Sequence, residues 1–377
     1  MSQTKVEAPF VDNNNVRFKN LIINGDMQIA QRATAATASG GNNIAYTTLD
    51  RFGFFNSLNG GYTSAQTALS VADQATTGQV KTLDIQCTTA DTSILAGDYA
   101  AVQQNIEAQN CQHLLWGTSA AKKLTVSFYI KSNLTGTTCG TIVKNDSTTY
   151  YYPFEFTINS ANTWEKKSVV IEPDSNIQAS AGAITNDNGI GLQLRINLTL
   201  GSNLTGGTNR TWTTSEKYAT SNQLNFLSST DNDLFLTGVQ LEVGDQATDF
   251  EYLPFDVQLQ RCQRYFYKES LYTAVGATGH VGCGQCNSTT RCDVPIRFPV
   301  FMRAIPTFSN SSADDFRLQH GGTLTVLSSF AGEGDGVVPF VSSSMLYCTV
   351  SSGLTAGNAA NLIHNNTAAT FQFDAEL

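Results

Sequence analysis

The chain has 377 residues, of which 14% are charged and 41% hydrophobic, and its net charge at pH 7 is -9. A protein that binds nucleic acid needs clustered Lys and Arg to neutralise phosphates, but the longest basic clusters here are pairs such as Lys122-Lys123. These numbers exclude nucleic acid as a partner. Thr, Ser, Asn and Gly replace the missing charged residues, which favours an all-β protein.

Residues 1–20 form a polar arm without hydrophobic periodicity, and we expect it to have no core of its own. The arm lacks the apolar stretch of a secretion signal, and the chain has no apolar run of 18 residues. We therefore expect synthesis in a cytoplasm and no membrane insertion.

Residues 21–254 carry the strand signals of an antiparallel β-sandwich or jelly-roll domain. Ile190–Leu200 alternates strictly between apolar residues and polar ones such as Arg195 and Asn197. This alternation predicts a half-buried strand with one face in water. Further strands are predicted at 20–24, 48–55, 123–132, 152–159, 167–172 and 234–243.

Residues 255–269 predict a short linking helix that Asp256 caps. Its apolar residues are Val257, Leu259, Cys262 and Phe266. They offer more apolar surface than a connector needs, so we predict that they form the interface of a homotrimer.

Residues 270–377 predict a second, smaller β-sandwich domain, with strands at 272–286, 291–298, 323–328, 345–351 and 370–373. His280, Cys283, Cys286 and Cys292 have a spacing that resembles a zinc site. The alternative is a hairpin that turns at residues 287–290. We favour the hairpin, because residues three apart on a strand face opposite sides. We therefore expect no metal, no cofactor and no disulfide among these cysteines.

The sequence has none of the common nucleophile, nucleotide or metalloprotease motifs, so we predict that the protein is not an enzyme. Aromatic rings are the usual contacts for sugars, because they stack on sugar C–H faces. Trp212 lies in a Thr- and Asn-rich loop and is the tryptophan we expect to be exposed. The predicted glycan-binding residues are Trp212, Tyr150 and Tyr151.

Several blocks of the sequence, taken together, resemble a large family of bacteriophage tail-fibre-like virion proteins of marine and cyanobacterial phages. The blocks are Asn20–Arg32, Tyr46–Phe52, Ala121–Lys131, Leu234–Phe250, Leu259–Phe266, Phe298–Thr307 and Phe373–Leu377. The opening block, NLIINGDMQIAQR, also resembles jelly-roll carbohydrate-binding modules. Such modules often hold a structural calcium, but Thr237–Val239 supplies no carboxylate here, which puts that site in doubt.

The resemblance implies a structural virion protein of the tail-fibre or receptor-binding type, located in the virion and made in the host cytoplasm. Its N-terminal arm would contact other virion proteins, and its β domains would meet a host surface glycan. The predicted anchoring residues are Val6, Pro9, Phe10 and Val11. The alternatives are a head decoration or tail adaptor protein without a receptor function, and a polysaccharide depolymerase.

Overall fold

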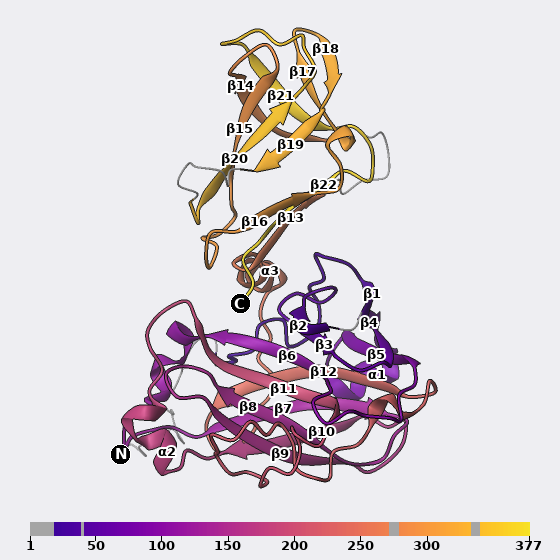
Figure 1. The fold of residues 1–377 in the computed structure, drawn as a ribbon, viewed down its shortest axis with the longest axis vertical. Coiled ribbons are helices and arrows are strands. Elements are labelled where there is room, and N and C mark those ends of the chain that lie inside the picture. Colours follow the sequence, from indigo (N-terminus) through magenta and orange to yellow (C-terminus); the bar gives the residue numbers. More distant parts are fainter. Residues whose placement is uncertain (1–18, 39–40, 271–278, 333–339) are drawn as a thin grey trace, which may run out of the picture.

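The computed structural model describes residues 19–38, 41–270, 279–332 and 340–377, and the fold is all-β (Figure 1). The predicted anchoring residues Val6, Pro9, Phe10 and Val11 lie outside the described residues. Every recorded strand pair within the described ranges is antiparallel, as the polar loops and alternating strands predict. No helix in these ranges is long and apolar enough to cross a membrane.

The N-terminal domain is a β-sandwich of two sheets. We call them the β7 sheet, with strand order β1-β4-β5-β12-β7-β10, and the β11 sheet, with order β2-β3-β6-β11-β8-β9. The strands of the β7 sheet are β1 (Ala35–Ala38), β4 (Gly61–Ala68), β5 (Lys81–Thr89), β12 (Asp233–Val243), β7 (Leu124–Ser132) and β10 (Glu165–Ile171). Those of the β11 sheet are β2 (Gly41–Ala45), β3 (Gly53–Asn56), β6 (Tyr99–Glu107), β11 (Ile190–Leu200), β8 (Gly136–Lys144) and β9 (Tyr150–Ile158).

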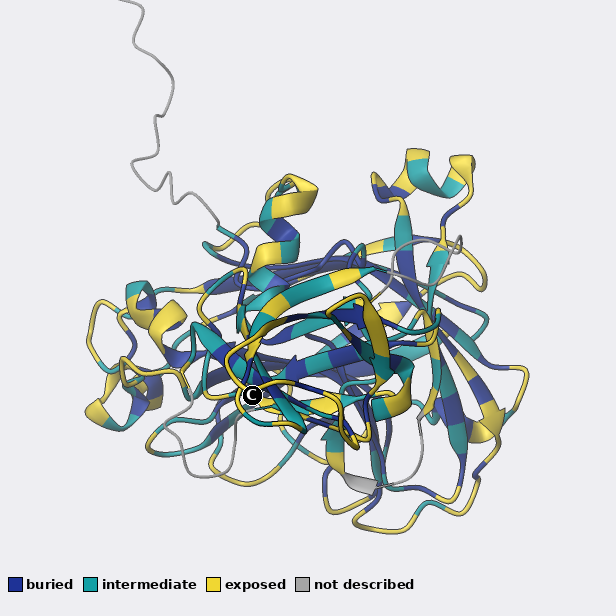
Figure 2. Ribbon diagram, turned by 90° about the horizontal axis from the view of Figure 1, so that it is seen from above, coloured by how far each residue is buried: buried dark blue, intermediate teal, exposed yellow. Residues whose placement is uncertain are grey.

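Alternation along β7 and β11 builds the core between the two sheets. Leu124, Val126, Phe128 and Ile130 of β7 are all fully buried, and each such side chain contributes about 1.5–3 kcal/mol through apolar burial. The connections contain α1 (Val71–Thr77), α2 (Ser175–Gln178), η1 (Ala108–Leu114), η2 (Ser180–Gly182) and η3 (Phe226–Ser228). Exposed residues gather in such connections, while the strands are mostly buried or intermediate (Figure 2).

The outer face of β11 is covered, which corrects the prediction that this face meets water. Gln193, Arg195 and Asn197 are 6%, 8% and 2% exposed. The loop after β11 crosses this face, and the backbone oxygen of Tyr218 accepts a hydrogen bond from Asn197 Nδ2 at 2.8 Å. The Tyr218 ring lies 4.2 Å from the guanidinium carbon of Arg195. Long-range packing of this loop therefore buries a polar face that alternation alone assigns to solvent.

The linking helix is α3 (Phe255–Gln263), which lies between the two domains in Figure 1. Its N-cap is Pro254, without a side-chain cap, so Asp256 lies in the first turn and does not cap the helix. A carboxylate there still favours the helix, because it faces the positive end of the helix dipole. β13 begins at Phe266 and pairs with β22, so the end of the predicted linker belongs to a sheet of the second domain.

The predicted trimer residues of this helix are largely covered by their own chain. Cys262 and Phe266 are fully buried, and Cys262 packs with Ile23, Ile29 and Tyr265. Neither side chain therefore offers surface to another chain, because packing within the same chain already removes both from water. Leu259 packs against the same cluster and Val257 is half-buried, while the homotrimer itself stays a prediction.

The C-terminal domain has a three-stranded sheet, β13-β22-β16, and a seven-stranded sheet, β18-β17-β21-β14-β15-β20-β19, within the described residues. The strands are β13 (Phe266–Ser270), β14 (His280–Cys286), β15 (Arg291–Arg297), β16 (Thr307–Asn310), β17 (Phe316–His320), β18 (Thr323–Val326), β19 (Ser329–Gly332), β20 (Ser343–Thr349), β21 (Ala359–His364) and β22 (Thr370–Asp374), with η4 (Ala313–Asp315). Phe316, Leu346 and Phe371 are among the fully buried residues of its core.

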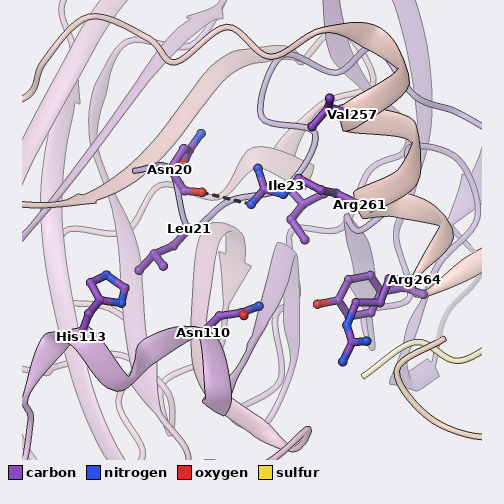
Figure 3. Close-up of a pocket in the computed structure, with 9 residues that line it drawn as sticks. Asn20, Leu21, Ile23, Asn110, His113, Val257, Arg261 and Arg264 are labelled. Carbon is purple, nitrogen blue, oxygen red and sulfur yellow. Dashed lines mark hydrogen bonds between the residues drawn. The ribbon is translucent and has the colours of Figure 1, made fainter. Parts of the chain in front are cut away.

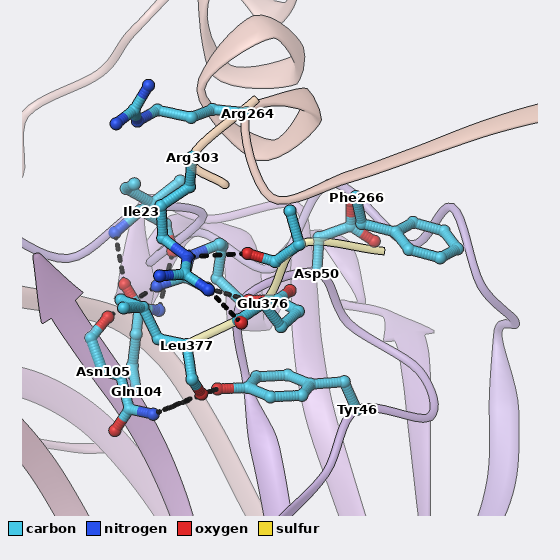
Figure 4. A network of polar contacts seen from close by, with 12 residues as sticks. Ile23, Tyr46, Asp50, Gln104, Asn105, Arg264, Phe266, Arg303, Glu376 and Leu377 are labelled. Atoms are coloured by element: carbon cyan, nitrogen blue, oxygen red, sulfur yellow. Dashed lines mark hydrogen bonds and ion pairs between the residues drawn. The ribbon is translucent and has the colours of Figure 1, made fainter. Parts of the chain in front are cut away.

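The last residues of the chain return to the N-terminal domain and join the two domains (Figure 4). The backbone oxygen of Leu377 accepts hydrogen bonds from Asn105 Nδ2 at 2.9 Å and from the Tyr46 hydroxyl at 3.2 Å. Arg303 donates to the backbone oxygens of Ala375 and Glu376, both at 2.7 Å, and of Asn188 at 3.0 Å. Glu376 pairs with Arg51. Charged and backbone groups of both domains therefore meet at the C-terminus.

Candidate functional site

The predicted sugar-binding ring Trp212 lies in the core, so the prediction that it is exposed is wrong. The residue is 4% exposed, and its ring centroid lies 5.4 Å from that of Trp116 and 4.9 Å from that of Tyr152. Its Nε1 donates to the backbone oxygen of Glu172 at 2.8 Å. The polar sequence around Trp212 reflects the loop, while the ring itself turns inward and fills the sandwich.

Tyr150 and Tyr151 differ in burial, because they alternate along β9. Tyr150 is 6% exposed and belongs to the sandwich core. Tyr151 points outward and is half-buried, and its ring packs edge-on against Tyr218 with centroids 5.4 Å apart. The structure therefore does not bring the three predicted residues together on an open surface.

A different set of rings lines an open hollow of about 280 Å³ on the outer face of the β7 sheet. We call it the aromatic groove. Its rings are Tyr129, Phe250 and Tyr252, and its polar side chains include those of Lys166 and Asp249. The remaining lining residues are Thr76, Thr77, Gly78, Ser127, Gly238 and Thr248.

The floor of the groove follows from alternation in β7 and from a bulge in β12. Ser127 and Tyr129 lie on the polar side of β7, opposite the buried Phe128. The register of β12 on β7 shifts between Thr237 and Gln240, and Gly238 there has φ 61°. A Cβ at Gly238 would lie 3.1 Å from Tyr129 Cδ2. Glycine therefore allows both the left-handed backbone of the bulge and the close approach of the Tyr129 ring.

The wall of the groove is residues 248–252, which hydrogen bonds fix against β12. Thr248 N donates to Glu242 Oε1 and Glu251 N donates to Gln240 Oε1, both at 2.8 Å. Glu251 in turn accepts from the backbone nitrogens of Lys19 and Asn20 at 3.0 and 2.9 Å. The start of the described chain therefore lies beside the groove and supports its wall.

Tyr252 is the most exposed of the three aromatic residues of the groove, at 59%. Its hydroxyl donates to the backbone oxygen of Gly78 at 2.7 Å and accepts from Gln79 Nε2 at 3.2 Å, which fixes the ring orientation. Partial burial raises the pKa of Tyr252, so the phenol is neutral at pH 7. The Phe250 ring stands edge-on to it, with centroids 5.3 Å apart at 72°.

The charged groups of the groove are exposed and of opposite sign. Lys166 Nζ lies 6.0 Å from the centroid of Tyr129, and Asp249 supplies a carboxylate. An ammonium, a carboxylate and hydroxyls beside fixed rings can hydrogen-bond sugar hydroxyls while the rings cover sugar C–H faces. The arrangement suits a polar ligand that has flat apolar faces.

A second cavity, of about 400 Å³, lies where α3 meets the start of the N-terminal domain (Figure 3). We call it the joint cavity. Arg261 reaches from α3 to the backbone oxygen of Asn20 at 3.2 Å. Arg264 donates two hydrogen bonds to the buried carboxylate of Glu107, at 2.7 and 2.8 Å. Burial lowers the pKa of His113 across the cavity, so that imidazole is neutral at pH 7. These contacts show that the cavity belongs to the packing of α3 against the N-terminal domain.

The cysteine hairpin forms as predicted, with β14 and β15 on either side of residues 287–290. Cys283 is exposed and Cys286 is buried, so these thiols lie on opposite sides of the strand. No group of three His, Cys, Asp or Glu residues in the described ranges is placed to hold a metal. Two acids near the first and last strands of the N-terminal domain are held by hydrogen bonds: Asp26 accepts from Gln28 and Gln258, and Glu242 accepts from Gln240 and Thr248.

The sequence analysis did not identify Tyr129, Phe250 or Tyr252 as candidate site residues. The available signal was Tyr129 itself, an aromatic residue between Ser127 and Lys131 on the polar side of a strand. Phe250 and Tyr252 lie close to it only because residues 248–252 fold back over the β12 bulge. No local pattern encodes that contact.

No family model matches the chain, and no curated protein matches it. Among solved structures, the enzymatically active domain of tailspike protein 4 of bacteriophage CBA120 is 11% identical, with a TM-score of 0.29, over 60% of this chain and 22% of that chain. A Bacteroides thetaiotaomicron protein described as sugar-binding is 14% identical, with a TM-score of 0.31, over 60% of this chain and 100% of that one.

The family 11 carbohydrate-binding module of a Clostridium thermocellum cellulosomal cellulase is 11% identical, with a TM-score of 0.26. That match covers 56% of this chain and 99% of the module. Similarity at these low values assigns no function to the chain.

Proposed function

We propose that this chain is a glycan-binding virion protein of the tail-fibre type that binds its ligand without cleaving it. The observation that carries the proposal is the aromatic groove on the outer face of the β7 sheet. Tyr129, Phe250 and Tyr252 line it together with Lys166 and Asp249.

The groove suits a saccharide in both size and chemistry. Its volume of about 280 Å³ is slightly below the usual range of ligand pockets, about 300–1,000 Å³, which favours a short stretch of a glycan. Tyr252 is 59% exposed and already fixed by its hydroxyl, so little side-chain entropy is lost when a sugar stacks on it. The hydroxyl and charged groups around the rings would then hydrogen-bond the sugar's hydroxyls.

Binding without cleavage is favoured because the described lining of the groove holds one acidic side chain and not the two that cleavage usually needs. Most glycoside hydrolases place two carboxylates on either side of the scissile bond. Asp249 is the only acidic residue among the described residues that line the groove. A polysaccharide-degradation assay tests the depolymerase alternative: shortening of a bound polysaccharide would contradict the proposal.

The virion part of the proposal rests on the resemblance of the sequence blocks. Residues 1–20 would anchor the chain to other virion proteins, and the oligomer would be a homotrimer. Asn20 is already fixed in the fold, because its backbone nitrogen donates to Glu251 Oε2. Lys19 and Asn20 therefore belong to the fold of the N-terminal domain. Electron microscopy of particles with a labelled C-terminus separates a tail fibre from the alternative head decoration or adaptor protein.

Binding to an array of bacterial surface glycans, followed by titration of each hit, tests the glycan function. We expect Tyr129→Ala and Tyr252→Ala to weaken binding about two- to tenfold each, the equivalent of one lost ring contact. Phe301→Ala is the matched control, because that ring is 67% exposed and lies outside the groove. Unchanged binding in both tyrosine variants, or no glycan bound by the native chain, would contradict the proposal.

A further inference from the structure

Three buried cysteines lie side by side across the large sheet of the C-terminal domain. Cys286 of β14 is directly opposite Cys292 of β15, and Cys292 is directly opposite Cys348 of β20. All are free thiols, and none is more than 1% exposed. Neighbouring thiols on adjacent strands are candidates for a covalent cross-link.

The two pairs differ in their backbone hydrogen bonds. Cys286 N donates away from β15, to Asn358 O, while Asn287 N donates to Arg291 O, both at 2.8 Å. Cys286 and Cys292 are therefore a non-hydrogen-bonded pair, the type in which opposite Cα atoms lie about 4.5 Å apart and side chains are closest. That spacing lies within the range of disulfides.

Cys292 and Cys348 are instead a hydrogen-bonded pair. Val350 N donates to Thr290 O at 2.8 Å, so Thr290 and Val350 are a hydrogen-bonded pair. Hydrogen-bonded and non-hydrogen-bonded pairs alternate along antiparallel strands, so the pair two positions further on, Cys292 and Cys348, is hydrogen-bonded as well. Opposite Cα atoms in such a pair lie about 5.5 Å apart, with their side chains farther from each other. Cys292 is therefore better placed to bond to Cys286 than to Cys348.

We propose that Cys286 and Cys292 are an oxidisable pair that forms a cross-strand disulfide when the folded chain meets an oxidant. With oxidised glutathione, the disulfide of the oxidant breaks and one forms between the two sulfurs. Both thiol protons pass to the two molecules of reduced glutathione that leave. The reaction closes the hairpin after folding, which is compatible with reduced thiols in a cytoplasm.

Burial makes this oxidation slow. Burial and, to a smaller extent, the neighbouring Cys286 raise the pKa of Cys292 to about 12. Little of the reactive thiolate therefore exists near neutral pH. The pair lies next to the turn at residues 287–290, and local opening of this turn admits the oxidant. Cys283 is exposed on the other side of β14 and should react earlier, as a mixed disulfide.

Differential alkylation with peptide mapping tests the pair on the native chain. After incubation with oxidised glutathione at mildly alkaline pH, we expect a peptide that links Cys286 to Cys292, and its loss on reduction. Cys348→Ser and Cys283→Ser are the matched controls and should keep the link, while Cys292→Ser should lose it. The melting temperature of the native chain should be higher in its oxidised form.

Two results would overturn the proposal. One is full alkylation of both Cys286 and Cys292 after oxidation. The other is a linked peptide that joins Cys292 to Cys348. Because mapping is done on the unsubstituted protein, a serine variant that fails to fold does not affect the outcome.

Discussion

Arg51 and Glu376 lie 325 positions apart in the chain and form an ion pair where the two β domains meet. Their side chains are 1% and 6% exposed. The Arg51 guanidinium also lies 3.5 Å from the centroid of Tyr265, and Nη2 donates to the backbone oxygen of Asn105 at 2.6 Å. The C-terminal residues thus supply the counter-charge for a cation buried in the N-terminal domain.

Replacing Glu376 with Ala should strongly destabilise the protein. Arg51 would remain buried without its carboxylate, and breaking a buried pair in this way costs about 3–5 kcal/mol. Urea unfolding followed by circular dichroism measures the loss in the free energy of unfolding.

Glu172→Ala is the matched control for that experiment. Glu172 pairs with Lys123 at 2.9 Å, but its side chain is 63% exposed, so removing it should leave the unfolding midpoint almost unchanged. Equal effects of the two substitutions would show that Glu376 is not needed to compensate Arg51.

Asp50 should make stability depend on pH. Burial raises the pKa of this carboxyl from its ordinary value of 3.8 to about 6, although Arg32 and the hydrogen bonds of Gln31 lower it. The folded state therefore binds the proton more tightly than the unfolded state. The resulting stabilisation is complete below about pH 4 and is lost as pH rises through about 6, on the order of 3 kcal/mol in total.

Comparison with Asp50→Asn isolates this carboxyl, because the other titrating groups are common to both proteins. The native chain should lose stability relative to the variant between about pH 4 and pH 7, measured by urea unfolding at each pH. A difference that stays constant or changes in the opposite direction would contradict the raised pKa of Asp50.

Alanine substitutions of Trp212 and Tyr252 should have opposite effects: the first should mainly reduce stability, and the second should mainly reduce glycan affinity. Trp212→Ala removes a core ring and should destabilise the protein by about 3–5 kcal/mol, while leaving glycan affinity unchanged under conditions where the variant is folded. Tyr252→Ala should reduce affinity with a much smaller loss of stability, since its ring is 59% exposed. If the folded Trp212 variant lost glycan affinity and the Tyr252 variant did not, the glycan would bind at the residues predicted from the sequence, Trp212, Tyr150 and Tyr151, and not in the aromatic groove.

Cys262→Asp should destabilise each chain by itself, because Cys262 packs against Ile23, Ile29 and Tyr265 of the same chain. The drop in melting temperature should therefore be independent of protein concentration. An interface residue would instead give a shift that depends on concentration, and that result would restore Cys262 to the predicted trimer interface. Light scattering on the native chain tests the homotrimer separately.

The strands with strict alternation could be predicted from sequence, because their pattern depends on local geometry. The structure places β11 at Ile190–Leu200 and β7 at Leu124–Ser132, close to the predicted ranges. What covers each face could not be predicted. Arg195 and Asn197 are polar and alternate with leucines, yet a loop that includes Tyr218 covers them.

The candidate site was also less predictable, because it depends on contacts between segments far apart in the sequence. Trp212 sits in a polar loop but turns into the core, whereas Tyr252 follows β12 and remains exposed. The groove depends on the β12 bulge at Gly238, and the register shift there arises from pairing between strands far apart in sequence. Residue types and spacing predict neither the bulge nor the segment that folds over it.

A crystal structure of the chain with a glycan identified by array binding tests the central claim most directly. We expect the sugar to lie in the aromatic groove, with a ring face against Tyr252 or Tyr129 and hydroxyls within hydrogen-bonding distance of Lys166 or Asp249. A glycan bound elsewhere on the chain, with the groove empty, would contradict the account.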